Sequence, residues 1–190
     1  MLVRKVPSFA RHAGRAKQQF SFELSQMTVE SGLPASPSGF LTVSTIVVQC
    51  GRGPKLYTSK EVETPKSAAS GVSLSHQKLS FRATLFESKK GKASGYSEKK
   101  YKIAVLAVKP DFGTTKTVFK EVAALEINVA DYLLDTEPRR MTLSLASTRR
   151  GGAPVVLELC ICARKVDGGA GDESDEEEEG PKAAARLEGE

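Results

Sequence analysis

The chain has 190 residues, of which 39% are hydrophobic and 27% are charged, so it can form one domain with a substantial core but not two full domains. It contains no run of about eighteen apolar residues that could cross a membrane, and its N-terminus lacks the apolar stretch of a secretory signal. We therefore expect a soluble, cytoplasmic protein.

Charge is divided unevenly along the chain. Residues 1–166 contain 26 Lys and Arg against 13 Asp and Glu, whereas residues 167–190 contain 2 against 10. The net charge of +5 therefore combines a basic body with an acidic tail. A basic body favours an anionic partner, such as a membrane surface or a nucleic acid.

The first segment, residues 1–16, is predicted to be a flexible basic leader. It contains no acidic residue, and on a helical wheel its arginines lie opposite its apolar residues. Two functional alternatives share this pattern: a basic amphipathic segment lying on an anionic membrane, and an organelle transit peptide. Pro7 and Gly14 interrupt any continuous helix, so we favour a flexible leader over both.

From residue 17 to residue 166 the chain shows almost only strand patterns. Apolar and polar residues alternate, and clusters of Gly, Pro and Ser separate the alternating segments. The segment YKIAVLAVK is more continuously apolar, which is typical of a strand in the middle of a sheet or buried on both sides. The eight predicted strands cover residues 20–29, 40–50, 54–62, 76–88, 101–109, 116–129, 139–147 and 153–166. Such a pattern predicts an all-β sandwich or barrel.

The segment EVAALEINVADYLLD, residues 121–135, changes its period halfway. From Ala123 to Val129 every second residue is apolar, whereas Ala130 and Leu133 are spaced like one helical turn. The change predicts a strand that runs directly into one short helical turn, which lays Tyr132 across the end of a sheet.

Six segments resemble, in their order and spacing, the N-terminal-type C2 domain family (NT-C2) of the EH-domain-binding proteins and the estrogen-induced early gene proteins. The segments are FSFELSQMTVESGLP, GFLTVSTIVVQC, LSFRATLF, YKIAVLAVK, FKEVAALEINVADYL and APVVLELCICARKV. The most specific is INVADYL, in which Ile127, Asn128, Ala130 and Tyr132 match the family's INLAEY. The resemblance covers roughly residues 17–166 and implies an eight-stranded antiparallel C2-like β-sandwich. In it these four residues build the fold, and Asn128 bonds to neighbouring backbone.

Many C2 domains bind membranes through calcium, which needs six to eight oxygen ligands from clustered acidic residues. Here the loop ESGLPASPSG contains Glu30 alone and the loop KPDFGTTK contains Asp111 alone, while Asp131 and Asp135 lie in the corner turn. We therefore expect no calcium site, as the resemblance also implies.

The predicted lipid-binding residues are basic and lie in or beside one Lys-rich loop, ESKKGKASGYSEKK, with Tyr96 at its tip. Each basic residue near an anionic leaflet contributes on the order of 1 kcal/mol, so several together support reversible membrane association. The alternative is a solvated loop that only keeps a β-protein soluble. The residues are Lys78, Arg82, Lys89, Lys90, Lys92, Lys99, Lys100 and Lys102.

Other chemistry has little support in the sequence. Cys50 stands alone, and Cys160 and Cys162 are too close on one strand to form a disulfide without distorting it, so all three are predicted to be reduced. With only His12 and His76 elsewhere, a metal site is not expected. No nucleophile motif, carboxylate pair or phosphate-binding loop points to catalysis. Aromatic residues that could stack on bases are too few to favour binding of a nucleic acid.

The last segment, residues 167–190, is predicted to be disordered because it combines a Gly-rich hinge with a run of like charge. Its simplest role is solubility. The alternative is an electrostatic lid that competes with an anionic ligand for the basic body. Ser174 precedes Asp175 and four glutamates, so it is a possible phosphosite for an acid-directed kinase, and a phosphate there would strengthen such a lid.

Together these features predict a non-enzymatic C2-type module without cofactor or metal. It would associate peripherally and without calcium with anionic phospholipid, in the membrane tethering and vesicle trafficking that the resemblance implies. The alternative is a protein-interaction scaffold without lipid affinity, whose protein partner the sequence does not identify. One flat basic face would favour lipid, whereas scattered lysines beside an exposed apolar strand edge would favour a protein partner.

Overall fold

The computed structural model describes residues 15–36, 39, 41–67, 71–88, 95–110, 117–133 and 137–166. Most of the predicted leader, the acidic tail with Ser174, and Lys89, Lys90 and Lys92 lie outside these residues. The described elements are β1 (Lys17–Ser31), β2 (Thr45–Arg52), β3 (Lys55–Thr58), β4 (Val62–Glu63), β5 (Val72–Leu74), β6 (Leu79–Phe86), β7 (Lys100–Pro110), β8 (Thr117–Asn128), the 3-10 helix η2 (Val129–Tyr132), β9 (Arg139–Ser147) and β10 (Val155–Lys165). The predicted all-β fold with one short helical turn is confirmed.

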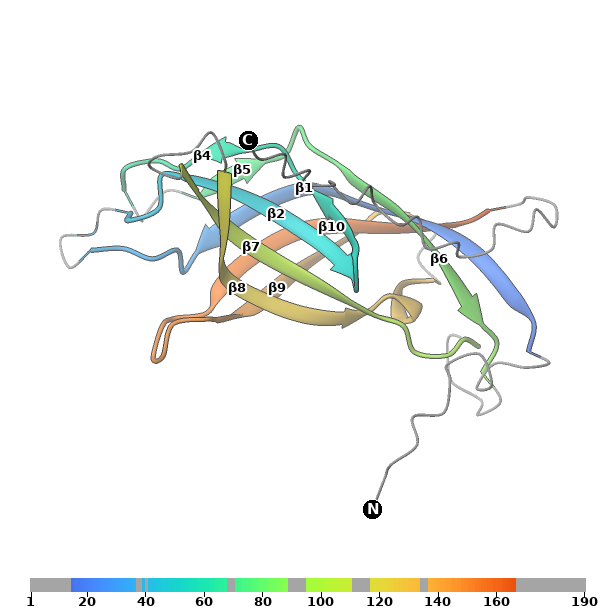
Figure 1. The fold of residues 1–190 in the computed structure, drawn as a ribbon. Coiled ribbons are helices and arrows are strands. Elements are labelled where there is room, and N and C mark those ends of the chain that lie inside the picture. Colours follow the sequence, from blue (N-terminus) through green and yellow to red (C-terminus); the bar gives the residue numbers. More distant parts are fainter. Residues whose placement is uncertain are drawn as a thin grey trace, which may run out of the picture.

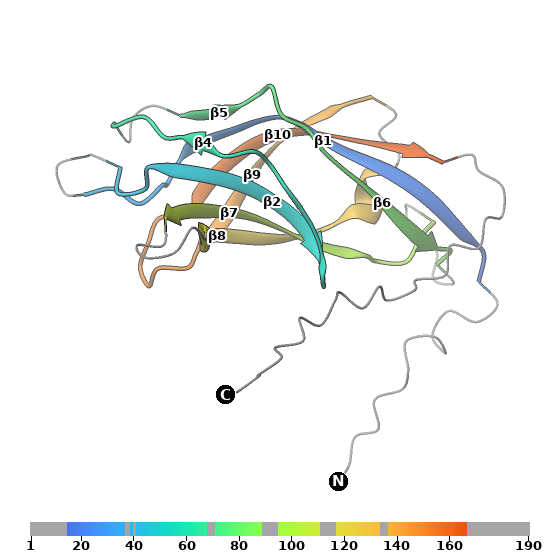
Figure 2. The same cartoon turned by 45° about the horizontal axis from the view of Figure 1, so that its top comes forward.

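The strands pair antiparallel in two layers that face each other (Figures 1 and 2). One layer has the order β9–β10–β1, and both β5 and β6 pair with β1. The other has the order β3–β2–β7–β8, and β4 also pairs with β2. The two layers are joined where Ala123 and Ala124 of β8 pair with Ser147 and Ala146 of β9. The result is a curled antiparallel β-sandwich.

The described part of the chain contains ten strands, whereas the sequence predicted eight. The strand predicted at 54–62 is divided into β3 and β4, because the Ser59 hydroxyl accepts a hydrogen bond from the Val48 N–H at 2.9 Å and interrupts the backbone ladder. The second addition is β5, a three-residue strand too short to show an alternating pattern. It pairs with β1 beyond a bulge at Gln26, whose φ of 50° turns β1 away from β6.

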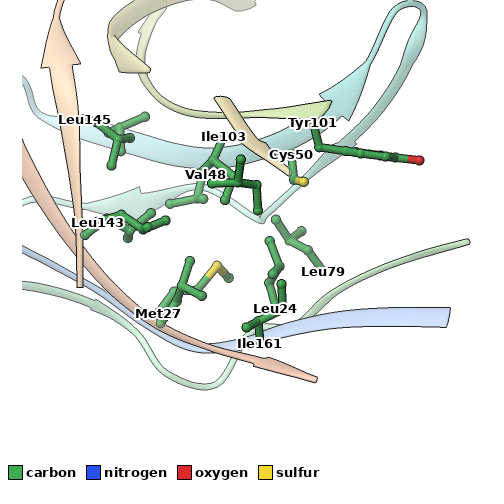
Figure 3. Packing of buried hydrophobic residues seen from close by; sticks show 14 of the residues in the cluster. Leu24, Met27, Val48, Cys50, Leu79, Tyr101, Ile103, Leu143, Leu145 and Ile161 are labelled. Atoms are coloured by element: carbon green, nitrogen blue, oxygen red, sulfur yellow. The ribbon is translucent and has the colours of Figure 1, made fainter. Parts of the chain in front are cut away.

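The core lies between the two layers. Phe22 of β1 stacks on Phe81 of β6 with ring centroids 5.3 Å apart, and Phe81 stacks on Tyr101 of β7 at 4.6 Å, so the aromatic stack crosses from one layer to the other. Aliphatic side chains fill the rest of this space. Figure 3 shows some of them, including Leu24, Met27, Val48, Ile103, Leu145 and Ile161.

The central strand β7 is buried on both of its faces. Every residue from Ile103 to Val108 is buried. The odd-numbered residues belong to the main core, while the even-numbered ones form a second apolar cluster with Val47 on the outer face of the layer. This double burial explains the continuous apolar sequence of the strand, since β7 lies between β2 and β8.

The corner after β8 is built around one amide side chain. Asn128 Oδ1 accepts hydrogen bonds from the Lys99 N–H at 2.9 Å and from the Ala130 N–H at 3.3 Å. Its Nδ2 donates to Asp131 Oδ1 at 2.7 Å. Ala130 is buried and Tyr132 packs half-buried against the core, so η2 covers one end of the sandwich.

Candidate functional site

The structure divides the predicted lipid-binding residues between the two layers. Lys78 and Arg82 lie at or on β6, and Lys100 and Lys102 lie on β7 in the other layer. All four side chains are exposed on the outer faces. The described members of the predicted set therefore do not gather on one surface.

Most of these lysines also have acidic partners. The Lys78 Nζ lies 3.0 Å from a Glu23 carboxylate oxygen, and the Lys102 Nζ lies 2.5 Å from one of Glu121. The Lys100 Nζ lies within 3.9 Å of carboxylate oxygens of both Glu98 and Glu126. Such exposed pairs contribute little to stability. They nevertheless offset the positive charge that would attract an external anion.

Two residues of the Lys-rich loop support the fold instead. The Lys99 Nζ is half-buried and donates to the Thr84 carbonyl at 2.9 Å, which ties the start of β7 to β6. Tyr96 was predicted at the loop tip, but it is half-buried and packs edge-to-face on Phe20, with ring centroids 5.3 Å apart. A bridge between Tyr96 and Glu87 places it where the loop leaves the sheet. Tyr96 is therefore not an exposed aromatic tip, because its ring completes the core.

Arg82 is in a different situation from the lysines. It lies directly opposite Ser21 of β1, and Ser21 lies directly opposite Arg164 of β10. Because paired residues of antiparallel strands point to the same face, both guanidinium groups project from one surface, with about 10 Å between their Cα atoms. Neither arginine side chain has a hydrogen bond or an ion pair with another described residue. This outer surface of β6, β1 and β10 is called here the Arg82–Arg164 face.

The Arg82–Arg164 face keeps a net positive charge. Lys17, at the start of β1, lies on the same side as Ser21, since the two are an even number of residues apart. Of the acids on this side, Glu23 pairs with Lys78 and Glu158 pairs with Arg140 at 2.6 Å, while Glu30 lies near the far end of β1, away from Ser21. The hydrogen bond that Arg140 donates to Glu158 also raises the pKa of Arg140, which stays charged. Lys17, Arg82 and Arg164 are thus left without acidic partners among the described residues.

Small polar side chains fill the space between these cations. They are Gln19, Ser21, Ser80 and Thr84, on the same sides of β1 and β6 as the two arginines. Guanidinium groups bind phosphate and carboxylate oxygens through two parallel N–H donors, and hydroxyl and amide groups add further donors. The face therefore offers the donors that an anionic group needs.

Sequence reasoning found Arg82 but missed Arg164 and Lys17. The alternation in CICARK does place Arg164 on the same side as Cys160 and Cys162. It does not reveal the neighbouring strands, and only the pairing of β1 with both β6 and β10 brings the two arginines together.

A second surface is apolar. At the start of β8, residues Thr117–Lys120 are all exposed, and the side chains of Val118 and Phe119 keep 48% and 49% of their accessible area. Phe119 lies opposite Val108, so it continues the outer apolar cluster of β7. We call Val118 and Phe119 the β8 apolar edge. Figure 1 shows the start of β8 at the end of the sandwich opposite the last residues of β10.

The described residues contain neither a cluster of metal ligands nor a membrane-spanning helix. No group of three or more His, Cys, Asp or Glu side chains there could hold a metal ion, and Asp111 lies outside them. The three cysteines are buried free thiols, and Cys160 Sγ donates to Gln26 Oε1 at 3.3 Å. No described helix is long and apolar enough to cross a membrane.

Comparison with known proteins gave fold similarity only. No protein-family model matches the chain, and no curated protein matches it. A C2 domain of plant extended synaptotagmin 1 is 9% identical with a TM-score of 0.47, and the match covers 81% of this chain and 100% of that domain. A C2 domain-containing protein ascribed to an elicitor-responsive gene is 12% identical with a TM-score of 0.43, covering 76% and 90% of the two chains. Both structures are C2 domains, and at these scores neither contributes to the functional argument.

Proposed function

We propose that residues 17–166 form a non-enzymatic C2-type module, of the NT-C2 kind, which binds anionic phospholipid surfaces without calcium. The protein would act in the cytoplasm, peripherally on membranes, in tethering or vesicle trafficking. The observation that supports this proposal is the Arg82–Arg164 face, where two arginines without acidic partners flank Ser21 on one strand surface.

The charge of the face supports weak, reversible binding. Each basic residue close to an anionic leaflet contributes on the order of 1 kcal/mol, so Lys17, Arg82 and Arg164 together contribute about 3 kcal/mol. We also propose that Lys89, Lys90 and Lys92, which follow β6 in the sequence, contribute to lipid binding. Binding that depends on charge alone weakens as salt shortens the Debye length.

The proposal is tested by flotation of the full chain with liposomes, neutral or containing phosphatidylserine or a phosphoinositide, at low and high salt, with and without calcium. We expect binding to anionic vesicles only, reversed by salt and unchanged by calcium. The double variant Arg82→Glu/Arg164→Glu should reduce binding about tenfold or more, since each reversal removes one attractive charge and adds a repulsive one.

The matched control is Lys109→Glu/Lys120→Glu, which makes the same change of net charge with exposed residues of the other layer. It should retain most of the binding. An equal loss in both variants would show that only the total charge matters and would contradict the assignment to the Arg82–Arg164 face. Absence of binding to every vesicle would overturn the lipid proposal.

The second candidate function, a protein-interaction scaffold, is favoured by the β8 apolar edge. Half-exposed Phe119 beside a buried apolar cluster is typical of a surface that a partner covers. Under this alternative, Phe119→Ser would abolish a crosslinked complex in cells while the protein binds no vesicles. Under the lipid proposal, Phe119→Ser would leave vesicle binding unchanged.

A further inference from the structure

The chain leaves the sandwich beside the Arg82–Arg164 face. Val166 follows the last residue of β10, and its N–H donates to the Gln19 carbonyl at 3.0 Å. Gln18 Nε2 donates to the Val166 carbonyl at 3.2 Å. Gln19 is two residues from Ser21, which lies between the two arginines, so these bonds fix the exit of the chain at the border of the face. Figures 1 and 2 both show the end of β10 beside the start of β1 and the end of β6.

The segment that follows this exit is acidic. Residues 167–190 contain ten Asp and Glu against two basic residues, and the densest acidic run is DESDEEEE, residues 172–179. The run carries the charge opposite to that of Lys17, Arg82 and Arg164.

The acidic run begins close enough to reach the face. It starts six residues after Val166, behind the sequence DGGAG. A Gly-rich chain of that length has an end-to-end distance of about 13 Å on average, and at most about 20 Å when extended. The two arginines lie about 10 Å apart beside the exit. Such a short connection gives an effective concentration in the millimolar range.

From this geometry we propose that the acidic run 172–179 docks on the Arg82–Arg164 face and competes there with an external anionic surface. The inference rests on the proposed function, because it gives a regulator to the same surface. Carboxylates of the run bind the guanidinium groups in place of lipid phosphates. The membrane therefore binds only those molecules in which the run is not docked on the Arg82–Arg164 face. A phosphate on Ser174 adds nearly two negative charges to the run and so strengthens its docking on the face.

Docking is tested first without lipid, by carbodiimide crosslinking of the full chain at low salt followed by peptide mapping. This reagent joins carboxylates to lysines, so lysines at the rim of the face report contact. We expect crosslinks from residues 172–179 to Lys17 and Lys78, which disappear at high salt. In Arg82→Glu/Arg164→Glu they should be lost although both lysines remain, whereas Lys109→Glu/Lys120→Glu should keep them. Crosslinks that persist in the arginine variant, or that reach lysines of both layers equally, would overturn the proposal.

Competition is then measured by flotation with phosphatidylserine vesicles. Changing Glu176, Glu177, Glu178 and Glu179 to Gln should raise vesicle binding about fivefold, because a larger fraction of the protein has an open face. The matched control changes four exposed acids of the body, Glu61, Glu63, Glu126 and Glu137, to Gln. An equal gain in this control, or no gain in the tail variant, would overturn the regulation.

The two measurements separate this inference from the proposed function. Crosslinks without any vesicle binding would support docking of the acidic run. They would overturn the lipid proposal and, with it, the competition between the run and the membrane. Vesicle binding that depends on Arg82 and Arg164, without crosslinks and without an effect of the tail variant, would overturn the inference and leave the lipid proposal intact.

Discussion

At the scale of single residues, Asn128 joins three parts of the corner. Its side-chain oxygen accepts from the N–H groups of Lys99 and Ala130, and its amide donates to Asp131. The Lys99 N–H lies before β7 and the Ala130 N–H lies within η2, so one side chain connects the start of a strand to the turn after its neighbour. Buried backbone donors need such partners, since an unpaired one is costly.

Replacing Asn128 by Ala should therefore lower the free energy of unfolding by roughly 2 kcal/mol, because two part-buried N–H groups lose their acceptor. Urea denaturation measures this loss. Asp131→Ala is the matched control, since it removes only the exposed bond to Nδ2, and should cost about 0.5 kcal/mol or less. Equal losses in the two variants would show that the backbone bonds of Asn128 do not matter.

At the scale of elements, two glycine-containing turns differ in what surrounds them. Gly32 follows β1 with a φ of 85°, and a Cβ at this position would lie 2.0 Å from the Pro154 carbonyl oxygen, just before β10. The backbone of the β1–β2 connection thus lies in direct contact with the backbone of the β9–β10 turn. Only glycine permits this close approach.

Gly32→Ala should lower the free energy of unfolding by about 3 kcal/mol or more, since it combines an unfavourable positive φ with a clash against backbone. Gly151→Ala is the control, because Gly151 has a similar φ of 72° but nothing within 4 Å of a Cβ. It should cost only about 1 kcal/mol. Thermal or urea unfolding of both variants gives the difference, and equal costs would contradict the close approach.

At the scale of the whole molecule, the core between the layers acts as one apolar environment for its ionisable groups. Burial raises the pKa of the Cys50 thiol from 9.0 to about 12, and burial together with Tyr57 raises that of Tyr101 from 10.0 to about 12. Both groups are neutral when protonated, and they come from adjacent strands, β2 and β7. The folded state therefore holds these protons more tightly than the unfolded chain does.

This difference predicts a loss of stability at alkaline pH. The contribution is complete below pH 9, where both states are protonated, and is lost as the pH rises towards the folded pKa values near 12. Cys50 contributes on the order of 4 kcal/mol to the free energy of unfolding, because each unit of pKa difference between the folded and unfolded states corresponds to about 1.4 kcal/mol. Urea unfolding from pH 7 to 12 measures the fall. In Cys50→Val the fall should be smaller and begin only near pH 10, and an unchanged profile would contradict the role of the thiol.

The charge of the whole molecule also depends on how distant segments are brought together. A count of charges separates a basic body from an acidic tail, but it does not show which cations remain without partners. In the folded chain Lys78, Lys100 and Lys102 each meet a carboxylate, whereas Lys17, Arg82 and Arg164 meet none among the described residues. The proposed lipid surface therefore differs from the Lys-rich loop that composition alone indicates.

Several features were determined by the sequence itself. Alternation of apolar and polar residues predicted six strands one by one and the region of β3 and β4. A continuous apolar run predicted β7, and the change of period at Val129 predicted η2. These signals are readable because strand and helix periods are set by residues two to four positions apart. The three-residue β5 is too short to carry such a period.

The tertiary structure alone decided the candidate site. Arg82 and Arg164 are neighbours only because β1 pairs with β6 on one edge and with β10 on the other. Tyr96 and Lys99 read as surface residues from their loop, yet one packs on Phe20 and the other bonds to the Thr84 carbonyl. The physical reason is that local patterns determine which face of a strand a residue occupies, whereas its partners depend on strand pairing between segments far apart in the chain.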